Sequence, residues 1–153
     1  MAFDMFVSYS HKDSNFCKEL LTYLTPLKHS GVANIWYDGD ITPGSEWEQQ
    51  IMQHLHSAKI ILLLISADFI ASKFCYSIEM KKAIDRHNAH DARVIPIILR
   101  PTYWKGAPFD KLKVLPQDGK PVVRWPTHDD AYENVIEGIL AAIEELKNPP
   151  AHP

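Results

Sequence analysis

The sequence predicts an α/β protein in which helices cover both faces of a parallel sheet. Short apolar segments alternate with longer segments of helical periodicity, which is typical of a parallel sheet with crossover helices. The apolar segment at residues 60–65, Ile-Ile-Leu-Leu-Leu-Ile, has no polar interruption, as expected of a strand buried on both faces. Five strands in this alternation favour the order 2-1-3-4-5.

The elements follow one another in a regular succession. The strands are expected at residues 4–8, 33–37, 60–65, 93–99 and 121–125. Helices are expected at residues 14–29, 45–58 and 128–146, with a capped single turn at 66–72 and then a helix that carries Glu79 and ends near residues 87–91. Asp13 or Ser14 is a candidate cap for the first helix, Ser45 and Glu48 form a capping box, and residues 127–130 cap the last helix. Pro96 lacks a backbone donor, so its strand is expected to be bulged or near a sheet edge.

Composition excludes several classes of protein. A chain of 153 residues suits one domain, and a net charge of −3 does not favour nucleic acid or an anionic membrane. No apolar run approaches the roughly 20 residues of a membrane span, and the first residues do not form a signal peptide. Only Cys17 and Cys75 are present, which fits a reducing cytosol, so a cytoplasmic location is expected. We expect a domain at residues 1–147 and a proline-rich tail or start of a linker at 148–153.

One carboxylate is expected near the ligand-binding edge of the sheet. Open parallel sheets bind ligands outside the carboxyl ends of their strands. Glu79 follows the central strand, and the crevice there is expected between the loop at residues 8–13 and the segment after Ile65. The loop at residues 38–44 flanks the crevice.

Several catalytic classes lack their motifs in this chain. Neither glycine-based phosphate loop is present, nor is a Gly-x-Ser-x-Gly nucleophile elbow. The first and third strands do not end in the acidic residues of a phospho-accepting receiver domain. The pairs His54–His56 and His87–His90 lack further ligands at matching spacing, so no metal site is expected.

A lone glutamate can still promote one reaction. A carboxylate stabilises the oxocarbenium-like state of glycosidic cleavage. Nicotinamide leaves its ribose as a neutral molecule from a cationic precursor, so this cleavage needs no general acid. One carboxylate could therefore suffice to cleave NAD+, whereas a solvated surface charge is the ordinary role of a lone helix glutamate.

The sequence resembles the Toll/interleukin-1 receptor (TIR) domain family over nearly its whole length. The matching segments are residues 4–10, 36–38, 41–44, 47–51, 60–66 and 72–79. Residues 8–13, Ser-Tyr-Ser-His-Lys-Asp, and 118–122, Asp-Gly-Lys-Pro-Val, look most like bacterial members. The resemblance implies a flavodoxin-like fold and self-association.

The family also implies a site. Some members cleave NAD+ to nicotinamide and a linear or cyclic ADP-ribose product, and others are adaptors that only bind similar domains. Glu79 matches the catalytic helix glutamate of the enzymatic members, and residues 38–44 match a loop that covers the site and mediates assembly. NAD+ is implied as substrate, with no cofactor. Substrate contacts are expected from Tyr9, Ser10, His11, Asp38, Ile41, Gly44, Trp47 and Cys75.

The sequence departs from the family at Cys75. Many enzymatic members carry Trp four residues before the glutamate, and here the nearest aromatic residues are Phe74 and Tyr76. Cys75 is interpreted as a buried small hydrophobe rather than a nucleophile, and Tyr9 as either a substrate contact or a cover for the sheet end. Two functions remain: a cytoplasmic NAD+-cleaving effector of defence or signalling, activated by self-association, and a non-catalytic adaptor. A sensor domain downstream of the proline-rich tail is a further expectation.

Overall fold

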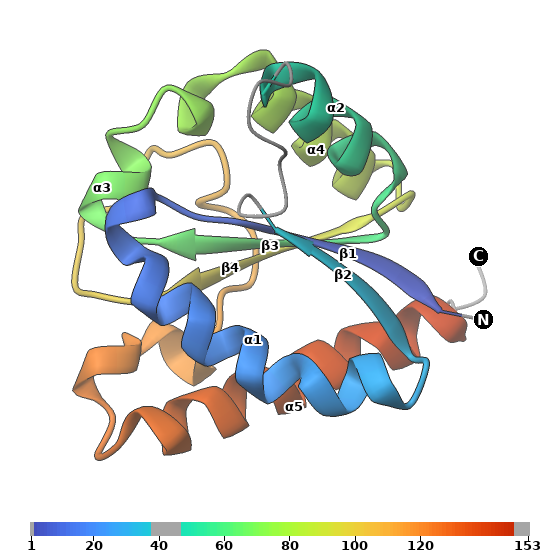
Figure 1. Cartoon of the computed structure of the whole chain (residues 1–153). Helices are drawn as coiled ribbons and strands as arrows, with labels where there is room; N and C mark the ends of the chain where they lie inside the picture. Colours follow the sequence, from blue (N-terminus) through green and yellow to red (C-terminus); the bar gives the residue numbers. More distant parts are fainter. Residues whose placement is uncertain (1, 38–46, 149–153) are drawn as a thin grey trace.

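A computed structural model gives the fold and describes residues 2–37 and 47–148, with residues 47 and 48 described by their backbone alone. Four parallel strands form one sheet in the order β2-β1-β3-β4 (Figure 1). The strands are β1 (Phe3–Ser8), β2 (Ala33–Tyr37), β3 (Ile60–Ile65) and β4 (Arg93–Ile98). The α/β class, the parallel sheet and the order of the first four strands are therefore confirmed.

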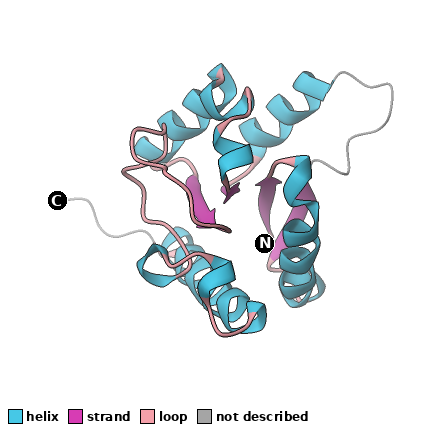
Figure 2. Ribbon diagram, turned by 90° about the vertical axis from the view of Figure 1, so that its left-hand side faces the viewer, coloured by secondary structure: helices cyan, strands magenta, loops and turns pink. Residues whose placement is uncertain are grey.

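Helices cover the sheet on both sides. Helices α1 (Ser14–His29) and α5 (His128–Lys147) lie on one face, and α2 (Trp47–Ser57) and α4 (Ile78–Asn88) lie on the other (Figures 1 and 2). The short helix α3 (Ala67–Ile70) follows the carboxyl end of β3. No helix in the described ranges is long and apolar enough to cross a membrane.

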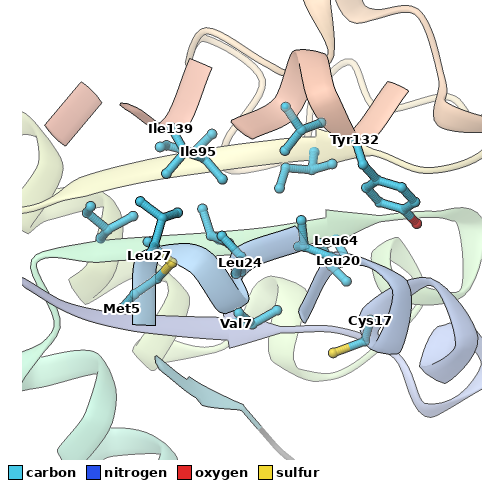
Figure 3. Packing of buried hydrophobic residues seen from close by; sticks show 14 of the residues in the cluster. Met5, Val7, Cys17, Leu20, Leu24, Leu27, Leu64, Ile95, Tyr132 and Ile139 are labelled. Carbon is cyan, nitrogen blue, oxygen red and sulfur yellow. The ribbon is translucent and has the colours of Figure 1, made fainter. Parts of the chain in front are cut away.

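Strand β3 joins the two halves of the core, because its side chains alternate between the faces of the sheet. Ile60, Leu62 and Leu64 pack into the cluster on the side of α1 and α5. Its other three side chains pack with α2 and α4. Figure 3 shows the first cluster, with Leu20 and Leu24 of α1 facing the sheet. All six β3 residues are completely buried, which explains their uninterrupted apolar sequence.

The expected fifth strand at residues 121–125 is wrong. Residues Val122–Arg124 form a 3-10 helix, η5, and the N–H of Val123 donates to the carbonyl of Leu99, the residue after β4, at 3.2 Å. Leu115 occupies the edge of β4 instead: its N–H donates to Pro96, and its carbonyl accepts from Ile98, both at 2.8 Å. Pro121 has no N–H with which to start a ladder, and the chain turns at once toward the cap of α5.

Two caps expected from the sequence are present, at Ser66 and Thr127, and the structure adds a third at Ser77. Ser66, Ser77 and Thr127 each accept a hydrogen bond from a backbone N–H of α3, α4 and α5, respectively. Asp13 is different: it stands at the N-cap position of α1, but its side chain makes no capping hydrogen bond. Its carboxylate is held by groups from elsewhere in the chain. The capping box predicted from Ser45 lies outside the described residues.

Candidate functional site

Glu79 lies in the first turn of α4, and two hydrogen bonds of Ser77 fix this helix start. The Ser77 hydroxyl accepts from the Met80 N–H at 3.1 Å and donates to the Phe74 carbonyl at 2.7 Å. The first turn of a helix attracts negatively charged groups, because the helix dipole is positive at this end. Glu79 is half-buried, and no described residue forms a hydrogen bond or ion pair with its carboxylate. The carboxylate is thus available to a ligand.

A groove of about 470 Å³ runs between α2 and α4, and Glu79 lines it. Leu55 and Ala83 are buried in the apolar cluster beneath these helices, and Met52 is 40% exposed. The groove therefore combines a carboxylate with apolar side chains, the combination expected of a small-molecule site. The described residues that line it are Met52, Gln53, Leu55, His56, Glu79, Lys82, Ala83 and Arg86.

Arg86 holds one end of the groove in place. Its Nη1 donates to the Leu55 carbonyl of α2, and its Nε donates to the Asp91 carboxylate at 2.9 Å. The hydrogen bond from Arg86 keeps the pKa of Asp91 below its ordinary value, with a smaller effect of the hydrogen bond from Lys59. Arg86 thereby links α2, α4 and the turn before β4, so we assign it a structural role.

A second polar cluster lies where the chain leaves β3 and β4. Asp13 is buried, and its Oδ1 accepts from Arg100 Nη2 at 3.0 Å and from Arg100 Nε at 3.2 Å. Its Oδ2 accepts from the Ser66 hydroxyl. Arg100 Nη2 also donates to Asp68 at 2.8 Å, and this bond is the main reason why the pKa of Arg100 is raised. Asp13 thus fastens the segment after β1 to the segments that follow β3 and β4.

The structure separates Glu79 from the residues predicted after β1. Tyr9 is half-buried against the apolar cluster on the side of α1 and α5, and its ring lies 6.0 Å from that of His11. Ser10 caps the 3-10 helix η1 (His11–Asp13) by accepting from the Lys12 N–H. None of these residues lines the groove of Glu79. Their substrate contacts stay predictions.

Cys75 is buried in the apolar cluster beneath α2 and α4, and burial raises the pKa of its thiol to about 11. Phe74 is half-buried and packs edge-on against Phe69, with ring centroids 6.1 Å apart. Tyr76 is 63% exposed, so it is the aromatic side chain beside Glu79 that remains open to solvent. The interpretation of Cys75 as a buried small hydrophobe agrees with this placement, and its substrate contact stays a prediction.

The remaining predicted residues cannot be placed in the site. Asp38, Ile41 and Gly44 lie outside the described residues, and Trp47 is described only as the first residue of α2. In the described part of the chain, no group of three or more His, Cys, Asp or Glu residues is arranged to hold a metal ion. His87 has a structural partner: its Nδ1 accepts from the Val94 N–H at 3.0 Å.

Sequence reasoning missed both the Asp13–Arg100 pair and the groove cation Lys82. Arg100 stands two residues after β4, and Asp13 stands five residues after β1, so charges beyond the carboxyl ends of strands in one parallel sheet were a usable signal. Lys82 stands three residues after Glu79, a spacing that places two side chains on the same side of a helix. What could not be read from this spacing is that α2 closes the other side of the groove.

The parallel sheet, the helices on both faces and the groove with its carboxylate define an α/β domain with a candidate small-molecule site. The model of the TIR domain family matches residues 5–135. The chain belongs to the TIR domain family. This confirms the resemblance stated from the sequence.

Two relatives show how far the similarity extends. The chain is 46% identical over 138 residues to the uncharacterized protein y4lF of Sinorhizobium fredii, a match that covers 90% of this chain and 43% of that protein. It is 26% identical over 148 residues to Toll-like receptor 2 of Capra hircus, covering 94% of this chain and 18% of the receptor. The chain therefore spans less than half the length of either relative.

Solved structures show the same fold at low sequence identity. The TIR domain of the Toll-related receptor TRR-2 from Hydra magnipapillata superposes with a TM-score of 0.58 at 18% identity, covering 91% of this chain and 99% of that domain. A prokaryotic SEFIR domain gives a TM-score of 0.52 at 17% identity, covering 99% of this chain and all of that one. The TIR domains of the activated Roq1 resistosome give 0.50 at 19% identity, covering 63% of this chain and 57% of that one.

Proposed function

We propose that this domain cleaves the bond between nicotinamide and ribose in NAD+, giving nicotinamide and ADP-ribose or its cyclic form. The observation that carries the proposal is the Glu79 carboxylate, half-buried in the groove between α2 and α4 and without a partner among the described residues. Membership of the TIR family supports the proposal, because some members of that family catalyse this reaction.

The proposed reaction requires little of the protein beyond this carboxylate. The N-glycosidic bond breaks and its electron pair leaves with nicotinamide, which becomes neutral. The positive charge passes to the ribose, where the ionised Glu79 stabilises it. Water then adds at C1′ and loses a proton, giving ADP-ribose, or an adenine nitrogen of the same molecule adds and gives the cyclic product.

The test uses purified protein, clustered by fusion to a defined oligomer, and etheno-NAD+ as a fluorescent substrate. We expect nicotinamide release by the wild-type domain and a loss of at least about 100-fold in Glu79→Gln, because about 3 kcal/mol of charge stabilisation disappears. Asp85→Asn is the matched control, since Asp85 is an exposed carboxylate of the same helix that does not line the groove. Undetectable cleavage by the clustered wild-type domain would refute the proposal.

We propose that self-association activates this domain and that the loop at residues 38–44 takes part in the interface. The fold shared with TIR domains of an activated resistosome supports an assembled active form. The proposed setting is a cytoplasmic defence or signalling effector, with a sensor domain elsewhere in a longer chain. The relative y4lF is consistent with a longer chain, because this chain covers only 43% of it.

A non-catalytic adaptor is the second candidate. Its support is the similarity to Toll-like receptor 2, which extends over 94% of this chain. An adaptor would assemble with similar domains but release no nicotinamide when clustered. Light scattering and the cleavage assay, performed on the same samples, separate the two functions.

A further inference from the structure

Lys82 is the cation of the Glu79 groove that the fold leaves available. Its side chain lines the groove and is exposed, and no described residue forms an ion pair or hydrogen bond with its ammonium group. Arg86, in the same groove, is already held by Leu55 and Asp91. Among the described residues, neither the Glu79 carboxylate nor the Lys82 ammonium group has a partner, and both belong to α4.

The spacing of Glu79 and Lys82 along α4 matches the size of a phosphorylated sugar. Three residues of an α-helix advance about 4.5 Å along its axis, so Glu79 and Lys82 lie about one turn apart on the same side. In a nicotinamide nucleotide, the 5′-phosphate and the C1′ carbon that bears nicotinamide are attached to the same ribose. A carboxylate placed at C1′ and an ammonium group one helical turn away thus match the two ends of a 5′-phosphorylated ribose.

The walls of the groove are compatible with such a ligand. Met52 and Leu55 of α2 line the wall of the groove opposite α4 and offer apolar surface to the sugar. His56 of α2 lies in the groove as well and is exposed. Glu79 is the only carboxylate among the described lining residues, so phosphate at Lys82 meets no second carboxylate there.

We propose that Lys82 binds the phosphate next to the cleaved ribose and makes this site selective for phosphorylated nucleosides. This inference rests on the proposed function, because it places the cleaved bond at Glu79. Lys82 acts in binding and specificity, and the chemical step remains with Glu79. A charge-assisted hydrogen bond to phosphate is the interaction expected of an unpaired lysine.

The first test compares nicotinamide mononucleotide, which has the phosphate, with nicotinamide riboside, which lacks it. We expect Lys82→Gln to lower kcat/KM for the mononucleotide and NAD+ at least about tenfold, and to leave the riboside nearly unchanged. Lys82→Arg should restore most of the loss. Lys81→Gln is the matched control, because Lys81 is an exposed neighbour that does not line the groove. Equal losses for phosphorylated and unphosphorylated substrates would overturn the inference.

A second test does not require activity. The affinity of Glu79→Gln for ADP-ribose is measured by calorimetry, with and without the additional change Lys82→Gln. A weakening of about tenfold or more supports the phosphate contact even if the wild-type domain cleaves no NAD+, in which case only the proposed function fails. An unchanged affinity, or an equal effect of Lys81→Gln, refutes the role of Lys82 whatever the activity.

Discussion

Asp13 is the charged residue that the fold buries most deeply among those described, with 1% of its surface exposed. It gains a hydrogen bond from the Ser66 hydroxyl and an ion pair with Arg100, so both of its oxygens are satisfied. A buried carboxylate without such partners would be strongly destabilising. The carboxylate therefore fixes the segment after β1 against the ends of β3 and β4.

We expect Asp13→Ala to lower the free energy of unfolding by about 3 kcal/mol, because Arg100 and Ser66 both lose their buried partner. Asp68→Ala is the control: Asp68 also pairs with Arg100, but 34% of its side chain is exposed, and a cost below about 1 kcal/mol is expected. Urea unfolding measures both. Equal losses for the two variants would contradict the importance of burial.

The buried thiol of Cys75 gives a prediction about reactivity. Its pKa is raised to about 11, so the reactive thiolate is scarce at pH 8, and the side chain is also inaccessible. We expect the native protein to react with a disulfide reagent far more slowly than the urea-unfolded protein. In Cys75→Ala, the labelling that remains comes from Cys17. Rapid native labelling that disappears in Cys75→Ala would contradict this burial.

At the scale of an element, β4 is the outer strand of the described sheet, and separate groups protect its exposed edge. Leu115 pairs near the carboxyl end, and the His87 ring accepts from Val94 near the other end. Partial burial lowers the pKa of His87, with smaller contributions from the charges of Arg93 and His90. The neutral imidazole is the form that can accept the Val94 N–H.

This arrangement makes stability depend on pH. The folded pKa of His87 lies below its ordinary value of 6.5, so the unfolded chain takes up the proton first as the pH falls. The contribution of His87 is therefore complete above about pH 6.5 and declines as the pH drops below it. We expect His87→Ala to lose about 1–2 kcal/mol at pH 8 and to show a weaker decline toward pH 5.

Thermal unfolding between pH 8 and pH 5 tests this effect. His56→Asn is the control, because His56 is an exposed imidazole that is not among the groups that shift the pKa of His87. A wild-type decline that His87→Ala leaves unchanged would assign the pH dependence to other groups.

At the scale of the whole molecule, one central strand joins two apolar clusters, and each cluster is closed by a pair of helices. Glu79 and Lys82 belong to one side, and Tyr9 packs on the other. The described part of a single chain thus supplies the groove but not the expected contacts of Tyr9. Because of this separation, nicotinamide release is best measured on the assembled protein as well as on the dilute protein.

We expect nicotinamide release per molecule to rise with protein concentration, in step with the oligomer mass measured by light scattering. The physical reason is that association is favoured by mass action when only the assembled form is active. Glu79→Gln, measured over the same concentrations, should form the same oligomers without cleavage. A constant rate per molecule across the range in which oligomers grow would contradict activation by assembly.

The amino-acid sequence alone determined the strands β1 to β4, their order, the main helices and two of their caps, Ser66 and Thr127. These features depend on local patterns: a run such as Ile60–Ile65, a serine before a helix, or apolar residues at helical spacing. It also placed Glu79 on a helix beyond the carboxyl end of the central strand. These patterns lie within a few residues of one another, so no tertiary information was needed to recognise them.

The tertiary structure alone decided which distant groups meet. Asp13 pairs with Arg100, 87 residues away, instead of capping its own helix. The reason is that a buried carboxylate is strongly destabilising unless a charged group pairs with it. Leu115 takes the edge of β4 that residues 121–125 were expected to occupy, because strand pairing is a competition between distant segments. The groove of Glu79 and Lys82 likewise exists only because α2 packs beside α4.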